Sequence, residues 1–183
     1  MLPAISEYSE LCLISSFDGL SSFGRKTAPE NQSFPALLAS GFDLFFPFDE
    51  HHFLSVLKQN GKRYLALNNQ EIAESIYTLA EDEELAVIDK ALAENPELIS
   101  LIHNPEAETV IIALGNYFEE LVKLSSLLLT RSASYHFVAV ARWSKLHNPE
   151  LLQQVKKAKK LIFILDQLPQ PAFLEQLAQL LEV

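Results

Sequence analysis

The sequence is poor in the residues that carry most recognisable chemistry. Among 183 residues, Cys12 is the one cysteine, so no internal disulfide can form, and none of the five glycines stands in the Gly-x-Gly arrangement of a phosphate loop. Basic residues are scarce too: 14 Lys and Arg against 24 Asp and Glu leave a net charge of −10, which disfavours nucleic acid and acidic membrane surfaces as partners. No apolar run approaches the ~18–20 residues that span a bilayer, and the N-terminus does not resemble a signal peptide. We therefore expect a cytoplasmic protein that binds neither nucleic acid nor membrane.

The remaining composition predicts one substantial hydrophobic core or two small ones. Hydrophobic residues make up 49% of the chain and charged residues 21%, a balance typical of packed globular proteins and not of disordered chains. Because Cys12 lies inside the apolar run 11–15, we interpret it as a small buried hydrophobe and not as a nucleophile.

The first 68 residues predict three strands that alternate with helices. Apolar runs rich in β formers indicate strands at 11–15, 42–46 and 64–67. Capping residues precede the two helical segments between them and glycines follow, namely Ser33 and Gly41 for the first and Asp49 and Gly61 for the second. Strand–helix alternation of this kind predicts parallel strands joined by crossover helices.

The segment around the second helix is dense in phenylalanine. We expect this helix to bury Phe53, Leu54 and Leu57 on one face. Core packing explains most of the neighbouring phenylalanines, whereas Phe48 and Phe53 could instead line a contact surface.

Residues 69–106 differ in character from what precedes them. An acidic run at 81–84 and Asn-Pro pairs at 95–96 and 104–105 separate short amphipathic pieces, of which the last carries Leu98 and Leu101. We predict a helical linker, and we interpret the acidic run as solvated and not as a metal site.

From residue 107 the alternation resumes. Strands are expected at 109–114, 137–141 and 161–165, each followed by a helix. The tripeptide Asn148-Pro149-Glu150 is a strong helix start, since it combines a capping side chain, a proline at the first helical position and an acid in the first turn. The predicted fold class is α/β, with two units of mainly parallel sheet and crossover helices in a Rossmann-like three-layer α/β/α arrangement.

Several motifs follow the order found in one enzyme family. Ala28-Pro29-Glu30-Asn31-Gln32 follows the first strand, Pro47-Phe48-Asp49-Glu50 the second, and Arg142-Trp143-Ser144-Lys145 the fifth. In this order the chain resembles transketolase, deoxyxylulose-phosphate synthase and related thiamine-diphosphate-dependent enzymes. Residues 1–68 resemble the late part of their pyrimidine-binding domain, and 107–183 their small C-terminal domain, joined by the linker at 69–106.

The chain departs from the family pattern mainly at positions that would contact a substrate. Asn31 stands at the histidine of the family loop Gly-Pro-Thr-His-Gln, and an amide cannot trade protons as imidazole does. His52 stands at the acid position of the family's Pro-x-Asp-x-x-Glu. Lys145-Leu146-His147-Asn148 replaces Lys-Pro-Leu-Asp, and of an acidic pair after the next strand only Asp166 remains. The family residues that survive here are mostly those that the fold needs.

The resemblance implies that this chain alone binds no cofactor. In the family, an upstream part of the pyrimidine domain supplies the glutamate that activates the cofactor, and another domain supplies the metal–diphosphate site. Only residues 1–10 precede the first expected strand here. We therefore expect no catalytic residue, and thiamine diphosphate with a divalent metal only if a partner completes the site. Family relatives dimerise through these domains, so a homo-oligomer or a partner subunit is implied.

Histidine adds no metal site to this interpretation. His51 and His52 are adjacent and diverge by about 100° on a helix. The other histidines, at positions 103, 136 and 147, have no cysteine or carboxylate at metal-ligand spacing. We expect no metal ligand in the chain.

The preferred function is a transketolase-like protein without catalysis of its own, either one subunit of a split enzyme or a non-catalytic interaction module. In a split enzyme the substrate-rim candidates are Arg25, Lys26, Asn31 and Gln32, of which the two cations could meet a sugar phosphate. The alternative is a stand-alone α/β module that binds a small anionic ligand at the carboxyl ends of its strands, with Gly115, Asn116 and Arg142 as ligand-binding candidates.

Overall fold

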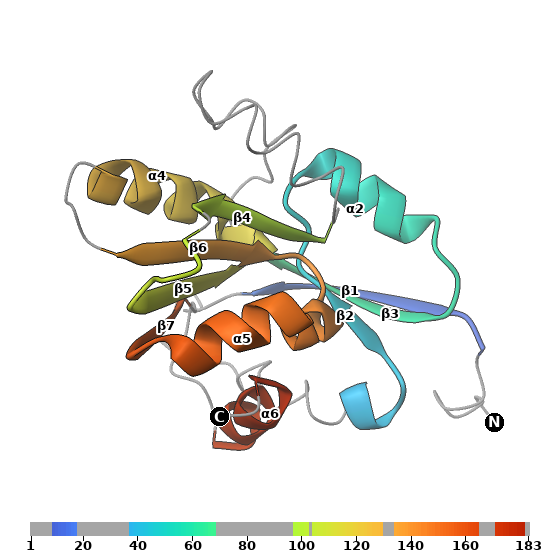
Figure 1. The fold of residues 1–183 in the computed structure, drawn as a ribbon. Coiled ribbons are helices and arrows are strands. Elements are labelled where there is room, and N and C mark those ends of the chain that lie inside the picture. The colour runs from blue at the N-terminus through green and yellow to red at the C-terminus, as the bar shows by residue number, and fades with distance from the viewer. Residues whose placement is uncertain are drawn as a thin grey trace, which may run out of the picture.

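Two β-sheets and the helices that cover them make up the described part of the chain (Figure 1). The computed structural model describes residues 9–17, 37–68, 97–102, 104–129, 134–164 and 171–181. Within these ranges no helix combines the length and the apolarity needed to cross a membrane.

The first sheet is parallel, as predicted. Its strands are β1 (Leu11–Phe17), β2 (Asp43–Phe45) and β3 (Lys62–Asn68), in the order β1-β3-β2. Both neighbours of β3 run parallel to it, and α2 (Glu50–Leu57) is the crossover between β2 and β3. The expected glycine positions are left-handed: Gly41 has a φ of 78° and Gly61 a φ of 97°, which favour glycine over other residues.

Helix α2 starts where the sequence predicts but buries a different face. The Asp49 carboxylate accepts a hydrogen bond from the backbone N–H of His52 at 2.7 Å, which confirms the cap. The prediction that Leu54 and Leu57 are buried is wrong: Leu54 is 51% exposed and Leu57 36%. Val56 is fully buried instead, because the helix turns it together with Phe53 toward the sheet, so Leu54 and Leu57 lie on a neighbouring face.

The second sheet contains four strands: β4 (Leu98–Ile102), β5 (Thr109–Leu114), β6 (Tyr135–Val140) and β7 (Lys160–Ile164), in the order β4-β6-β5-β7. β5 pairs in parallel with β6 and β7, which confirms the three strands expected after residue 107.

Strand β4 corrects the prediction of a helical linker as far as residues 98–102 are concerned. It pairs antiparallel with β6, and its Ile99 is fully buried. Leu98 and Leu101, spaced as on a helix face, instead belong to an edge strand whose backbone groups bond to β6. Residues 69–96 of the predicted linker lie outside the described residues, so the linker's boundaries stay a prediction.

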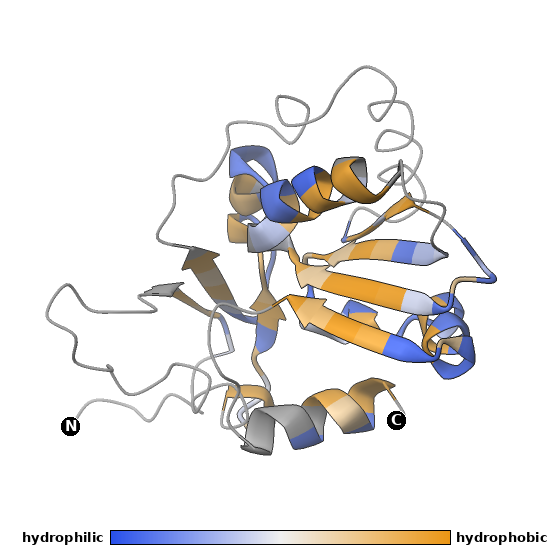
Figure 2. Ribbon diagram, turned by 90° about the vertical axis from the view of Figure 1, so that its left-hand side faces the viewer, coloured by the Kyte–Doolittle hydropathy of each residue, from blue (hydrophilic) through white to orange (hydrophobic). Residues whose placement is uncertain are grey.

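Helices cover both faces of the second sheet. A short turn, η4 (Gly115–Tyr117), leads into α4 (Phe118–Leu129) on one face. The other face carries η5 (Trp143–His147), α5 (Pro149–Lys157) and α6 (Pro171–Leu181), as Figure 1 shows. Between these layers the strands are almost entirely hydrophobic, as the orange colour in Figure 2 shows. The fold is the predicted three-layer α/β/α arrangement.

A continuous hydrophobic core joins the two sheets. It includes Phe42, Leu44 and Phe46 from the first unit and strands β5 and β6 from the second. Phe48 is only 5% exposed, so the idea that it lines a contact surface is wrong, and Phe53 is half-buried. Cys12, which was expected to be buried, is only half-buried, and it packs against the smaller cluster around Val56.

Candidate functional site

The carboxyl ends of strands from both sheets meet each other. Phe46, directly after β2, donates its backbone N–H to the carbonyl oxygen of Ala141, directly after β6, at 2.7 Å. Phe45 and Arg142 form an isolated antiparallel bridge beside it. We call this region, residues 43–49, 114–118 and 140–146, the carboxyl-edge junction. Ligands of α/β proteins bind outside the carboxyl ends of parallel strands, so the junction is the first place to look for a site.

Gly115 serves the contact between the sheets. A Cβ atom at this position would lie 2.0 Å from the Phe46 carbonyl oxygen and 2.9 Å from Cδ1 of Phe48. Glycine is therefore required because the backbone of the first unit approaches it so closely. Asn116 follows in η4, and its side chain is outside the described part of the structure.

Arg142 ties the two units together through charge. Its Nε donates to Oδ2 of Asp43 at 2.6 Å, and its Nη1 lies 3.3 Å from Oε2 of Glu97. The guanidinium also lies over the Phe45 ring, 5.2 Å from its centroid. The hydrogen bond that Arg142 donates to Asp43 is the main reason that the pKa of Arg142 is raised above its ordinary value, with Glu97 adding to it.

The charges around Arg142 balance one another. Glu97 has a second cation, Lys145, whose Nζ lies 3.5 Å from its Oε2, and its carbonyl oxygen accepts the N–H of Ala141 at 2.9 Å. Two carboxylates, Asp43 and Glu97, thus face two cations, Arg142 and Lys145. The cluster carries no excess positive charge that would attract an anion.

His52 fills the position where the resembled family has an acid. Its Nδ1 lies 3.5 Å from the backbone N–H donor of Phe48, and the two rings are 5.4 Å apart. Burial lowers the pKa of His52 below its ordinary value, although Glu97 and Asp49 pull it upward. At neutral pH the ring is therefore uncharged, and it packs against Phe48 beside the junction as an acceptor.

The four substrate-rim candidates, Arg25, Lys26, Asn31 and Gln32, lie outside the described residues, as does Asp166. The last described residue before them, Phe17, pairs with Asn68 at the carboxyl end of the first sheet. Their roles remain predictions.

The described residues do not build a metal–diphosphate site. Among them, no group of three or more His, Cys, Asp or Glu side chains lies close enough to hold a metal ion. His51 is exposed while His52 is half-buried, so the adjacent pair diverges as expected. Next to Gly115, where a backbone could approach a phosphate, the Phe46 carbonyl takes the space.

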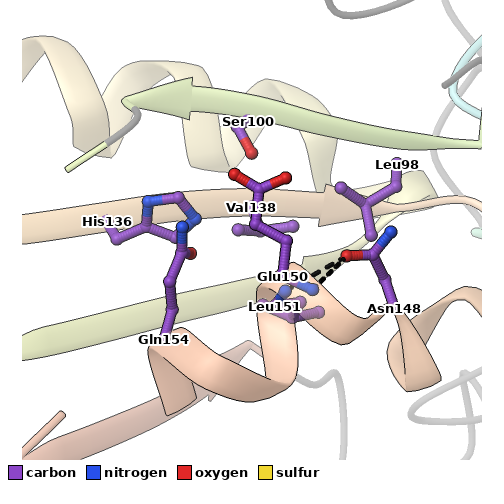
Figure 3. Close-up of a pocket in the computed structure, with 8 residues that line it drawn as sticks. All are labelled: Leu98, Ser100, His136, Val138, Asn148, Glu150, Leu151 and Gln154. Carbon is purple, nitrogen blue, oxygen red and sulfur yellow. Dashed lines mark hydrogen bonds between the residues drawn. The ribbon is translucent and has the colours of Figure 1, made fainter. Parts of the chain in front are cut away.

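Three features of the structure were not predicted from the sequence. Asp43 and Glu97, the partners of Arg142, gave no sequence signal because they are 99 and 45 residues away from it. A shallow pocket beside α5, drawn in Figure 3, includes Gln154, a buried polar residue. Gln154 does have a sequence signal, because this polar residue lies one turn after Leu151 and so interrupts an apolar helix face.

Solved transketolase structures share the fold of this chain. The transketolase of Campylobacter jejuni subsp. jejuni matches with a TM-score of 0.56 and 14% identity, over 92% of this chain and 29% of its own. A transketolase mutant of Pichia stipitis matches with a TM-score of 0.51 and 12% identity, over 93% of this chain and 28% of its own. A split-gene transketolase, described as an inactive beta4 tetramer, matches with a TM-score of 0.44 and 14% identity, over 76% of this chain and 54% of its own.

Sequence comparison adds no family to this likeness. No protein-family model matches the chain, and no curated protein matches it. The chain spans 29% and 28% of the first two transketolases. At 14% and 12% identity these two structures show the fold alone, and that fold is transketolase-like α/β.

Proposed function

We propose that this chain is a transketolase-like assembly module without catalysis of its own, acting as one subunit of a split enzyme or as a non-catalytic interaction module. The observation that carries the proposal is the carboxyl-edge junction. In this fold class the carboxyl edge is where ligands bind, and here the residues that follow β2 of the first sheet occupy that edge of the second.

The composition of the junction supports a structural role. Phe46 and Phe48 are buried, and Gly115 admits the Phe46 carbonyl where a ligand would otherwise approach. Because Arg142 pairs with Asp43 and Glu97, the conspicuous cation of the junction serves the contact between units.

Another chain would have to complete a binding site for thiamine diphosphate and a divalent metal. The described residues bring no cluster of metal ligands and no phosphate cradle, so they do not fit the cofactor. We derive no catalytic step through it. A partner that carried the diphosphate site would supply the chemistry, and the rim candidates Arg25, Lys26, Asn31 and Gln32 would face the substrate in the completed enzyme.

The alternative function, binding of a small anion near Gly115 and Arg142, has less support. It needs an uncompensated cation at the carboxyl edge, whereas the four charged groups there balance.

Native mass spectrometry of the tagged chain, purified from its own cells, tests the proposal. We expect a complex heavier than one chain. A partner with a thiamine-diphosphate-binding domain would identify a split enzyme, and a homo-oligomer would identify an interaction module. A monomer with nothing attached would contradict both forms of the proposal.

A further inference from the structure

Strand β1 lies at the end of the first sheet, and among the described residues no strand pairs with its outer edge. Its seven residues, Leu11–Phe17, include no charged residue and no proline. Edge strands usually carry such residues, because the free N–H and C=O groups of an edge otherwise pair with another chain. An edge without them is suited to the addition of a strand.

Every second residue of β1 presents its backbone groups to this outer edge. The N–H of Leu11 donates to the carbonyl oxygen of Gly61, directly before β3, at 3.3 Å, so the backbone groups of Leu11 face β3. The backbone groups of successive residues in a strand point to opposite sides, so those of Cys12, Ile14 and Ser16 point away from β3. These three residues can donate to and accept from an added strand.

Exposed hydrophobic side chains lie on the same part of the molecule. Of the four large hydrophobic side chains exposed in the described part of the chain, Ile14, Leu54 and Leu57 belong to β1 and α2, and Ile14 is 51% exposed. Ile14 pairs in register with Leu65, which packs with Val56 beneath α2. Ile14 therefore lies on the face of the sheet that α2 covers.

Leu54 and Leu57 lie on the flank of α2 nearer to β1. Helix α2 connects β2 to β3, and crossovers between parallel strands are right-handed. With Phe53 and Val56 directed toward the sheet, this handedness turns Leu54 and Leu57 away from β2 and toward β1. The outward backbone groups of β1 and these exposed side chains thus form one surface, which we call the β1 edge.

We propose that the β1 edge pairs with the β1 edge of a second copy of this chain, antiparallel and across a two-fold axis at Ile14. Ile14 is the middle residue of β1, so an axis there pairs the whole strand. Each Ile14 exchanges both backbone hydrogen bonds with its counterpart, and residue 12 of each copy faces residue 16 of the other. The two exposed Ile14 side chains meet on the α2 face and bury each other.

Charge and symmetry favour a second copy at this surface. The chain has a net charge of −10, so two copies repel each other over most of their surfaces. Pairing of the two β1 strands brings only uncharged residues together. The contact is self-complementary, so it needs no residue from a different protein. The inference rests on the proposed function, in which the chain acts within an assembly, and it names one surface of that assembly.

Sedimentation of the purified full chain over a range of concentrations tests the proposal. We expect a dimer that dissociates on dilution. Ile14→Lys places two like charges across the axis and should raise the dimer dissociation constant by at least about tenfold. Leu127→Lys, the same change at an exposed leucine of α4, is the matched control. Because both substituted side chains are exposed, circular dichroism should show an intact fold in both variants.

Disulfide trapping tests the register of the two strands. Cys12→Ser/Ile14→Cys has a single cysteine, which lies on the two-fold axis. Opposed Cα atoms of a hydrogen-bonded antiparallel pair are about 5.5 Å apart, which is within disulfide range, so we expect a cross-linked dimer under mild oxidation. The unmodified chain is the control, because its Cys12 faces residue 16 of the other copy and should stay unlinked.

Three results would overturn the inference: a monomer at every concentration, an equally stable dimer of Ile14→Lys, or cross-linking of the Ile14→Cys variant no faster than that of the unmodified chain. If the pure chain is monomeric and Ile14→Lys instead releases a different protein captured from cells, the β1 edge belongs to that protein. The proposed function would survive each of these results, because it fails only if the chain from its own cells carries nothing.

Discussion

At the scale of single residues, Gly115 controls how closely the two sheets approach. Gly115→Ala would place a methyl group 2.0 Å from a backbone oxygen that cannot rotate away. Overpacking of this kind costs about 3 kcal/mol of unfolding free energy. Urea denaturation measures the loss.

Gly61→Ala is the matched control for Gly115→Ala. A Cβ at Gly61 meets nothing within 4 Å, so its cost comes only from the φ of 97° and is about 1 kcal/mol. If Gly115→Ala were as stable as the unmodified chain, the claim that the Phe46 carbonyl lies too close to Gly115 for a Cβ atom would be refuted.

His52 makes stability depend on pH. Because burial lowers its pKa in the folded state, the unfolded chain binds more protons than the folded chain below the ordinary histidine value of 6.5. Its stabilising contribution is full above that pH and is lost as the pH falls toward the lowered pKa, by at most about 1.4 kcal/mol per pH unit.

The His52→Asn variant should therefore lose less stability than the unmodified chain between pH 6.5 and mildly acidic pH. Thermal unfolding across this range measures the difference, with the exposed neighbour exchanged in His51→Asn as control. An identical pH profile for His52→Asn and the unmodified chain would show that His52 is not the titrating group.

At the scale of elements, the start of α5 depends on one side chain. Asn148 accepts hydrogen bonds from the backbone N–H groups of Glu150 at 3.0 Å and Leu151 at 3.1 Å. Asn148→Ala should cost about 1 kcal/mol of unfolding free energy, the usual value for a lost N-cap, whereas Asn148→Asp should retain it. Urea denaturation of both variants checks this, and equal stability of all three proteins would refute the capping role.

An element could be predicted from the sequence when its signal lies in neighbouring residues, and not when it depends on contacts with distant parts of the chain. The start of α5 was predictable because Asn148, Pro149 and Glu150 stand side by side in the sequence. β4 was not, because its short run of Leu98 to Ile102 also fits one turn of amphipathic helix, and only pairing with β6 makes it a strand. The buried face of α2 was missed for a related reason: an eight-residue helix offers several apolar stripes, and contact with the sheet selects one.

At the scale of the whole molecule, the Arg142 cluster should hold the two sheets together. Arg142→Met would leave Asp43 without the guanidinium that bridges the units. We expect a loss of about 1–2 kcal/mol, below the value for a fully buried pair, because a third of the Arg142 side chain is exposed. Hydrogen exchange of the Phe46 amide, which bonds across the junction, should become faster.

Lys123→Met provides the control for Arg142→Met. Its ion pair with Glu119 lies within one helix and on the surface, so its loss should leave the exchange of Phe46 unchanged. If Arg142→Met left that exchange rate unchanged as well, the cluster would not be a link between the units.

The long-range part of the candidate site could not be predicted from the sequence. Alternation of strands and helices predicted two parallel units, because that signal is periodic. The contact of Arg142 with Asp43 joins residues 99 positions apart, and the closeness of Gly115 to Phe46 depends on how the two sheets meet. Both arise from the arrangement of the whole chain.

Isothermal titration of the chain with thiamine diphosphate and Mg²⁺ tests the central claim most directly. If the chain is an assembly module that another chain must complete, no saturable heat should appear up to ~1 mM cofactor, where the binding free energy is already as weak as about −4 kcal/mol. Saturable binding of one thiamine diphosphate per chain would contradict the claim.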